Sequence, residues 1–289
     1  MLSPCSDWRL HTQAASFPHA LIGDSTHRPT PFPTIFRRPT PLRHYVYAAG
    51  QLWLVGAEEG EFDHDAHANA LKAHSLSSAQ KQHSGGISGG VGAEQYWLEL
   101  LQMLQKSELL PSVIFSFSKV KCDEIAFGFA GRLKLISPGN TQLVGSICDE
   151  CLGRLPPEDR SLQQVVRCRE LLQCGVGVHH SGLLPIIREM IEILFSRGLI
   201  KVLFATETFA VGVNMPARAV VFNGVRKNDG RSFRELLPGE YTQMSGRAGR
   251  RGIDAHGAVI VAGELIDAPR LQAIVVGNPP SLTSKFTMT

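Results

Sequence analysis

The 289 residues are 43% hydrophobic and carry 29 Lys and Arg against 26 Asp and Glu, a net charge of +3. This content allows one substantial core, and the charge is too small to indicate nucleic-acid binding by itself. No run of roughly 20 apolar residues and no apolar core of a secretory signal occurs, which excludes a membrane span and indicates a protein inside the cell. The six cysteines, few for this length, fit a reducing compartment.

The N-terminal part mixes Pro, His, Ser and Thr without apolar periodicity, which predicts disordered or non-native sequence. Residues 45–55 then place aromatic and β-branched side chains around Gly50, a pattern typical of a small hairpin. The run SGGISGGVG predicts a flexible linker, and we place a domain boundary there. The expected segments are a disordered stretch at 1–34, a connecting segment at 35–83, a linker at 84–92, the main domain at 93–264 and the beginning of a further module at 265–289.

Beyond the linker, apolar periodicity alternates between helix and strand. The expected order is helix 94–110, strand 113–117, helix 119–130, helix 159–173, strand 176–179, helix 185–197, strands 200–205 and 219–222, helix 241–247 and strand 258–262. This order predicts an α/β fold, a largely parallel sheet with helices on both faces. Ligands of such sheets bind beyond the carboxyl ends of the strands, so the loops after Phe117, His180, Ala205 and Phe222 are the expected site.

The string QMSGRAGRRG places Arg247 and Arg250 three residues apart, a spacing that puts both on one face of a helix. Guanidinium groups can stabilise charge on the oxygens of a transferring phosphoryl group, and glycine lets the backbone approach closely. A basic surface turn is the alternative. The string resembles motif VI of superfamily 2 helicases, which implies that Gln243, Arg247 and Arg250 contact the nucleotide and that both arginines are catalytic.

Upstream, LFATETFAVGVNMPA resembles motif V of the DExH helicases of the superkiller and nuclear exosome type. A strand ending in Thr206, Glu207 and Thr208 can offer hydroxyl and backbone donors to an RNA phosphate. Gly212 and Asn214 would turn the chain toward the nucleotide. Capping of a strand end or helix by the two threonines is the alternative.

Two shorter strings also resemble RNA-contacting motifs of this family. In VIFSFSKVKCDE, Ser116 and Ser118 can donate to the RNA backbone or serve local structure. In GVHHSG, the candidates are His180, Ser181 and Gly182. Adjacent histidines can also hold a metal, but no third or fourth ligand at workable spacing accompanies them, so no metal site is expected.

Between motifs V and VI, VFNGVRKNDGRSFREL contains Asp-Gly, a strong hairpin signal. In the family it resembles, a hairpin at this position helps to part duplex strands. Arg226 and Lys227 are therefore expected to hold RNA phosphates. A solvated charged hairpin is the alternative.

The resemblance as a whole implies the second RecA-like lobe of an exosome-associated, superkiller-type helicase of superfamily 2. It further implies ATP-dependent 3′-to-5′ movement along RNA, with superkiller complex subunits and the exosome as partners. The expected compartment is the cytoplasm, with the nucleus as the alternative. By the same resemblance, residues 35–83 connect the first lobe to the second, and residues 265–289 lead into a winged-helix module.

Two motifs of an active ATPase, the G-x-x-x-x-G-K-[ST] loop and the DExH box, do not occur in the sequence. We therefore expect no ATP hydrolysis by this chain alone, with ATP and Mg²⁺ bound only in a complete two-lobe enzyme. A fragment or truncated gene product fits this pattern. A non-catalytic RNA- or protein-binding module and a gene remnant are the alternatives.

Overall fold

The computed structural model describes residues 38, 40–57, 61–83, 91–128, 132–212 and 215–277. The stretch at 1–34, most of the Gly/Ser run and the last twelve residues, 278–289, lie outside this description. All the described residues fall within one structural unit.

A seven-stranded sheet runs through this unit in the order β2-β1-β9-β6-β3-β5-β4. Neighbouring strands are parallel, except that β1 and β2 form an antiparallel hairpin at one edge. A separate two-stranded hairpin, β7-β8, follows β6 in the chain. The strands are β1 Leu42–Ala48, β2 Gln51–Ala57, β3 Ser112–Phe115, β4 Val176–His179, β5 Val202–Ala205, β6 Ala219–Asn223, β7 Arg226–Asn228, β8 Phe233–Glu235 and β9 Gly257–Ala262.

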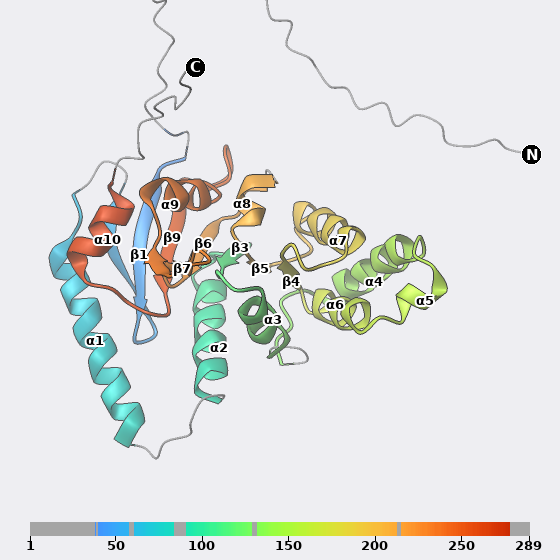
Figure 1. Ribbon diagram of the computed structural model, residues 1–289, viewed down its shortest axis with the longest axis horizontal. Coiled ribbons are helices and arrows are strands. Elements are labelled where there is room, and N and C mark those ends of the chain that lie inside the picture. Colours follow the sequence, from blue (N-terminus) through green and yellow to red (C-terminus); the bar gives the residue numbers. More distant parts are fainter. Residues whose placement is uncertain are drawn as a thin grey trace, which may run out of the picture. The chain divides into compact units, whose positions relative to one another are not determined.

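Helices cover both faces of the sheet. Figure 1 shows α2 and α3 on one side of the strands and α8 and α9 on the other. None of the helices in the described ranges combines the length and apolarity that crossing a membrane requires. The helices are α1 His64–His83, α2 Val91–Lys106, α3 Lys119–Gly128, α4 Pro138–Leu152, α5 Pro157–Arg160, α6 Gln163–Gln173, α7 Pro185–Ser196, α8 Thr208–Gly212, α9 Pro238–Ser245 and α10 Ala268–Val275.

The core has two layers because successive strand residues face opposite sides of the sheet. On β5, Phe204 belongs to the apolar cluster that contains α2, whereas Leu203 belongs to the cluster that contains α7. From α2, the fully buried Leu100, Leu101 and Leu104 pack in the first cluster. Each such side chain contributes about 1.5–3 kcal/mol to folding, so these helices are fixed to the sheet and in turn fix the loops between them.

The expected parallel α/β architecture is confirmed, and β4 has the predicted bounds of 176–179. The hairpin expected around Gly50 also forms, as β1 and β2. It does not stand apart from the main domain, however, because β1 pairs in parallel with β9. The Gly/Ser run therefore does not separate two domains within the described residues. Its last two positions, 91 and 92, already belong to α2.

Helices α1, α4, α8 and α10 were not among the elements expected from the sequence. Helix α4 lies in the stretch between 130 and 159, and it begins with Ser137, whose side chain accepts from the amide of Asn140, followed by Pro138 in the first turn. Helix α1 lies in the segment that precedes the Gly/Ser run. Helix α10, in the segment expected to begin a further module, buries Leu271 and Ile274 in the same core.

Candidate nucleic-acid and nucleotide interface

The carboxyl ends of four parallel neighbours, β4, β5, β3 and β6, lie at one edge of the sheet. A pocket of about 160 Å³ opens there, between the loops that follow β3, β4 and β5 and the β7-β8 hairpin. This edge gathers four separate sequence motifs into one surface. The residues that line the pocket are Phe117, Lys119, Ser181, Thr206, Glu207, Thr208, Lys227 and Asn228.

Five of the predicted RNA-binding residues thus meet at one pocket, but they are not equally accessible. Ser181, Glu207 and Thr208 are exposed, whereas Thr206 is 7% exposed. The hydroxyls of Thr206 and Thr208 lie 3.0 Å apart, and the carbonyl of Thr206 accepts from the amide of Phe209. The two threonines therefore take part in local hydrogen bonds, and of the two only the side chain of Thr208 is exposed to a ligand.

Two other predicted RNA-binding side chains serve local structure. Ser116 is 1% exposed, so its side chain does not reach the surface as expected. Ser118 accepts from the amide of Lys121 at 3.4 Å, at the start of α3. Together these features fix the segment after β3, from which Phe117 and Lys119 line the pocket.

His180 is also buried, at 3% exposed. Its Nδ1 accepts from the amide of Gly182 at 3.1 Å, so its Nε2 carries the proton and donates to Asp123, also at 3.1 Å. Both ring nitrogens are occupied, which corrects the expectation of a ring facing RNA. The ring instead ties the loop after β4 to α3, and it leaves Ser181 and Gly182 exposed.

The neighbouring His179 has a different carboxylate partner. Its Nε2 lies 2.7 Å from Glu192 on α7, while burial lowers its pKa despite that contact. Each histidine is thus paired with one acidic side chain. In the part of the chain that the structure describes, no group of three or more His, Cys, Asp or Glu side chains could hold a metal ion.

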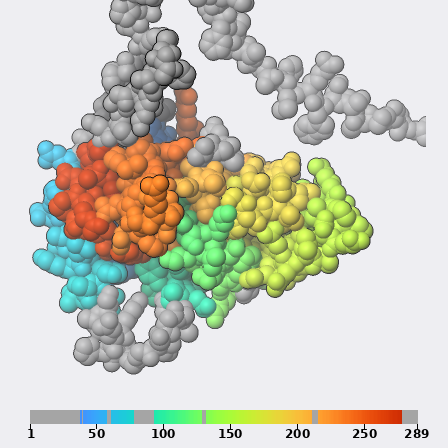
Figure 2. Space-filling model, viewed as in Figure 1, coloured from blue at the N-terminus to red at the C-terminus, as the bar shows by residue number. Residues whose placement is uncertain are grey.

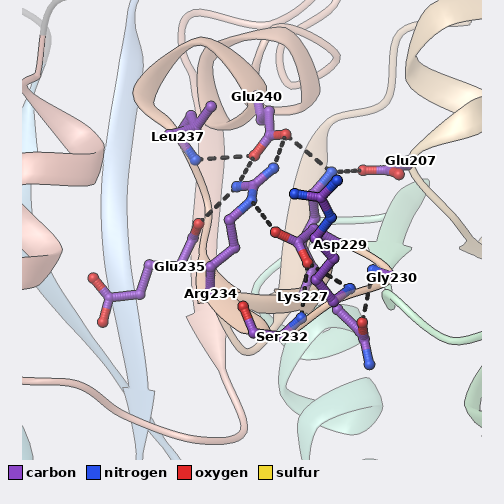
Figure 3. A network of polar contacts seen from close by, with 11 residues as sticks. Glu207, Lys227, Asp229, Gly230, Ser232, Arg234, Glu235, Leu237 and Glu240 are labelled. Carbon is purple, nitrogen blue, oxygen red and sulfur yellow. Dashed lines mark hydrogen bonds and ion pairs between the residues drawn. The ribbon is translucent and has the colours of Figure 1, made fainter.

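The β7-β8 hairpin forms where the Asp-Gly pair predicts it, with Gly230 at a φ of 93°. Lys227, expected to hold phosphate, is 12% exposed and bonds Glu207 at 2.5 Å and Glu240 at 2.9 Å. Arg234 bonds both oxygens of Glu240 at 2.8 and 2.9 Å (Figure 3). Hydrogen bonds from Arg234 and others lower the Glu240 pKa to about 2, so this carboxylate stays charged. Lys227 is therefore already neutralised by two carboxylates.

Arg226, on the same hairpin, is far more accessible. It is exposed and pairs only loosely with Glu264, at 3.5 Å. Beside it lies a second pocket of about 360 Å³, which Lys121 and Phe233 also line. Phe233 is 68% exposed, a large apolar side chain next to two cations. Sequence reasoning missed Phe233 and Lys119, although an aromatic residue beside an Asp-Gly turn is a usable signal.

The arginine loop, residues 246–252, follows α9, and its geometry differs from the expected helix. Helix α9 ends at Ser245, and Ala248 pairs with Ala217 as an isolated bridge. Arg247 lies in a turn and Arg250 lies outside any helix, so the two are not on one helix face. Gly249 lies between the two arginines and permits this non-helical path, because its φ of 85° is accessible to glycine at little cost.

The two arginines have different partners within the lobe. Arg247 donates from Nη2 to the carbonyl of Ala210 on α8. Arg250 forms a bidentate pair with Asp254, at 2.8 and 2.9 Å, and this pair lowers the Asp254 pKa. Gln243 is exposed on α9, Gly212 ends α8, and Asn214 lies outside the described residues.

The segment that precedes β1 forms hydrogen bonds to the arginine loop. Arg38 donates from Nη2 to the carbonyl of Gly246 at 2.6 Å and to that of Ala248 at 2.8 Å. A side chain at Gly249 would meet Thr40 at 2.6 Å. The loop is thus held between this segment and the beginning of β9, a contact that no sequence pattern indicated.

The parallel sheet, the loops at its carboxyl edge and the arginine loop behind α9 define a RecA-like helicase lobe. A family model described as "Helicase conserved C-terminal domain" matches residues 156–252, the range from α5 to the arginine loop.

Relatives narrow the class further. The chain is 45% identical to superkiller complex protein 2 of Homo sapiens over 269 residues, which is 87% of this chain and 21% of the relative. It is 46% identical to antiviral helicase SKI2 of Saccharomyces cerevisiae over 199 residues, 68% of this chain and 15% of the relative. It is 41% identical to exosome RNA helicase MTR4 of Homo sapiens over 256 residues, 87% of this chain and 24% of the relative.

The chain thus belongs to the superkiller-type DExH helicases of superfamily 2, and it corresponds to their C-terminal, second RecA-like lobe. It spans about a fifth of the length of the curated relatives that it matches.

Proposed function

We propose that this chain serves as the second lobe of an ATP-dependent helicase that moves 3′-to-5′ along RNA and delivers it to the exosome for decay. The partners are RNA, superkiller complex subunits and the exosome, and the compartment is the cytoplasm, with the nucleus as the alternative. The names of two relatives, a superkiller complex protein and an exosome RNA helicase, support this assignment.

The observation that carries the proposal is the surface at the carboxyl edge of the sheet. Lys119, Ser181 and Thr208 are exposed around one pocket, and Arg226 and Phe233 are exposed around the next. Cations and hydroxyls suit the phosphates of a strand, and an exposed aromatic ring suits stacking of its bases. In Figure 2 the orange atoms of the hairpin and α9 lie beside the green atoms of the segment that contains α3.

The arginine loop fits one side of a triphosphate site. Arg247 and Arg250 carry guanidinium groups that can stabilise charge on a phosphoryl group, which bound ATP supplies. Arg250 is paired with Asp254, so phosphate would share it with that carboxylate. Gln243 is exposed one helical turn before the loop. We assign ATP and Mg²⁺ to the complete two-lobe enzyme, because charge from the opposite lobe's nucleotide gives the arginines their role.

The experiment compares two lysine variants of the full chain for binding of a fluorescent single-stranded RNA by anisotropy. Lys119→Ala removes a cation at the carboxyl edge, and we expect about three- to tenfold weaker binding. Lys201→Ala is the matched control, because this lysine precedes β5 at the opposite end of the sheet. We expect it to bind like the wild type.

Equal losses in both variants, or a loss in Lys201→Ala alone, would place RNA elsewhere and contradict the proposal. ATP turnover, measured on the same samples, tests the expectation that this chain alone does not hydrolyse ATP. A chain that binds RNA without turnover is a lobe that needs its partner or a non-catalytic binding module. A folded chain without RNA affinity fits a gene remnant.

A further inference from the structure

Glu240 lies in the first turn of α9, between the hairpin and the arginine loop. Its Oε2 accepts from the amide of Leu237 at 2.9 Å, which caps the helix. The same carboxylate accepts two hydrogen bonds from Arg234 and contacts Lys227 at 2.9 Å. One side chain therefore joins both strands of the hairpin to the beginning of α9 (Figure 3).

Helix α9 is fixed at this place by the residue that follows Glu240. Tyr241 stacks on Phe222 of β6, with ring centroids 4.8 Å apart. Its buried hydroxyl lies 2.8 Å from Nδ1 of His44 on β1. Through Tyr241, α9 is therefore fixed to two strands of the sheet. The contacts of Glu240 join the hairpin to this rigid helix.

The contacts continue through α9 and return to the pocket. Two residues beyond the helix, Arg247 donates to the carbonyl of Ala210. The amide of Ala210 donates to the carbonyl of Glu207 at 3.0 Å, and the side chain of Glu207 bonds Lys227 at 2.5 Å. These contacts form a closed ring from Glu240 through Arg247, Ala210, Glu207 and Lys227.

We propose that Glu240 is a positioning residue that holds the hairpin and the arginine loop in one arrangement. A phosphate that binds near Lys227 competes with Glu207 for the same ammonium group. Its arrival is thereby transmitted through Glu240 and α9 to Arg247. The identity of the ligand rests on the proposed function, whereas the ring itself is independent of it.

The experiment measures hydrogen exchange by mass spectrometry on the full chain as wild type and as Glu240→Gln. Glutamine keeps the acceptor that caps α9 but loses the charge that holds Lys227 and Arg234. In the free chain we expect amides of residues 226–235 and 246–250 to exchange together, about fivefold faster than in the wild type. Amides of β9 should be unchanged, which shows that the variant is folded.

Glu264→Gln is the matched control. Glu264 pairs with Arg226 on the hairpin, and within the described residues its carboxylate forms no hydrogen bond or ion pair with α9. We expect this variant to leave residues 246–250 at the wild-type rate. Two results would overturn the role of Glu240. One is that Glu240→Gln speeds exchange in the hairpin but not at residues 246–250, and the other is that both variants change exchange at 246–250 equally.

A second arm adds a single-stranded oligouridylate as the probe. In the wild type, RNA should change exchange at residues 246–250, and in Glu240→Gln this change should be absent although RNA still binds. RNA binding without any change at 246–250 in the wild type contradicts the transmission. A wild type that binds no RNA refutes the proposed function, and the free-chain rates still decide the positioning role of Glu240.

Discussion

His44 shows how burial changes the chemistry of one residue in this lobe. Its Nδ1 lies 2.8 Å from the hydroxyl of Tyr241, and the residue is 9% exposed. Burial, with a further contribution from the charge of Arg38, lowers the His44 pKa from 6.5 to about 4. The folded state therefore holds a neutral imidazole at pH values where the unfolded chain is already protonated.

This residue should make stability depend on pH. Because the unfolded chain binds a proton first, stability is present above about pH 6.5 and falls as the pH falls toward 4. The loss attributable to His44 reaches about 3 kcal/mol by pH 4. Urea unfolding at a series of pH values measures it, with His44→Gln as the variant that cannot titrate. Parallel pH profiles for the two proteins would show that His44 contributes nothing.

Single residues were the scale at which the sequence was least informative about the site. Strand-end patterns correctly placed Ser116 and His180 near the carboxyl ends of the parallel strands. They did not predict the direction in which the two side chains point. That direction depends on partners distant in sequence, such as Asp123 for His180. The same holds for Lys227, whose two carboxylate partners come from a loop and a helix that local patterns do not bring together.

The arginine loop departs from the helix expected there, and two of its glycines adopt conformations that permit this path. Gly249 and Gly252 both have a positive φ, at 85° and 75°. A Cβ at Gly249 would lie 2.6 Å from Thr40 and 3.1 Å from Gly257, whereas a Cβ at Gly252 would meet nothing within 4 Å. The two positions thus share the backbone strain and differ in crowding.

These two glycines separate the effects of strain and packing. Gly252→Ala should destabilise the lobe by about 1 kcal/mol through backbone conformation alone. Gly249→Ala should cost about 3 kcal/mol or more, because the segment before β1 must also move. Urea unfolding of both variants checks this difference. Equal losses would mean that the loop relaxes freely and is not held against Thr40.

Elements with strong local signals were predicted well, and those that depend on distant pairing were not. Helix α7 begins at Pro185 and is followed by Gly198, and both residues are boundary signals in the sequence. Gly198 has a φ of 69°. The pairing of β1 with β9 joins segments about 200 residues apart, which no local pattern specifies. Helix α4 was missed because its Ser137 and Pro138 signal lies in a stretch without a clear apolar period.

At the scale of the whole molecule, the fold brings the motifs that follow β3, β4 and β5 to one edge, where the carboxyl ends of parallel strands meet. The arginine loop lies instead beside the amino ends of β6 and β9. The alternating strands and helices were sufficient to predict that edge, because the connections between parallel strands leave no other arrangement for the loops. The similarity to superkiller-type helicases then assigns the edge to a known class of lobe. The RNA contacts themselves remain the central prediction.

Binding of single-stranded RNA to the full chain across a salt series tests that prediction most directly, with Arg226→Ala and Phe233→Ala as variants. We predict that affinity falls with salt, that Arg226→Ala reduces the slope of the log–log plot by about 0.7, and that Phe233→Ala keeps the slope but weakens binding roughly 5- to 150-fold. Binding that is insensitive to salt, or that neither variant changes, would contradict an RNA site at this edge.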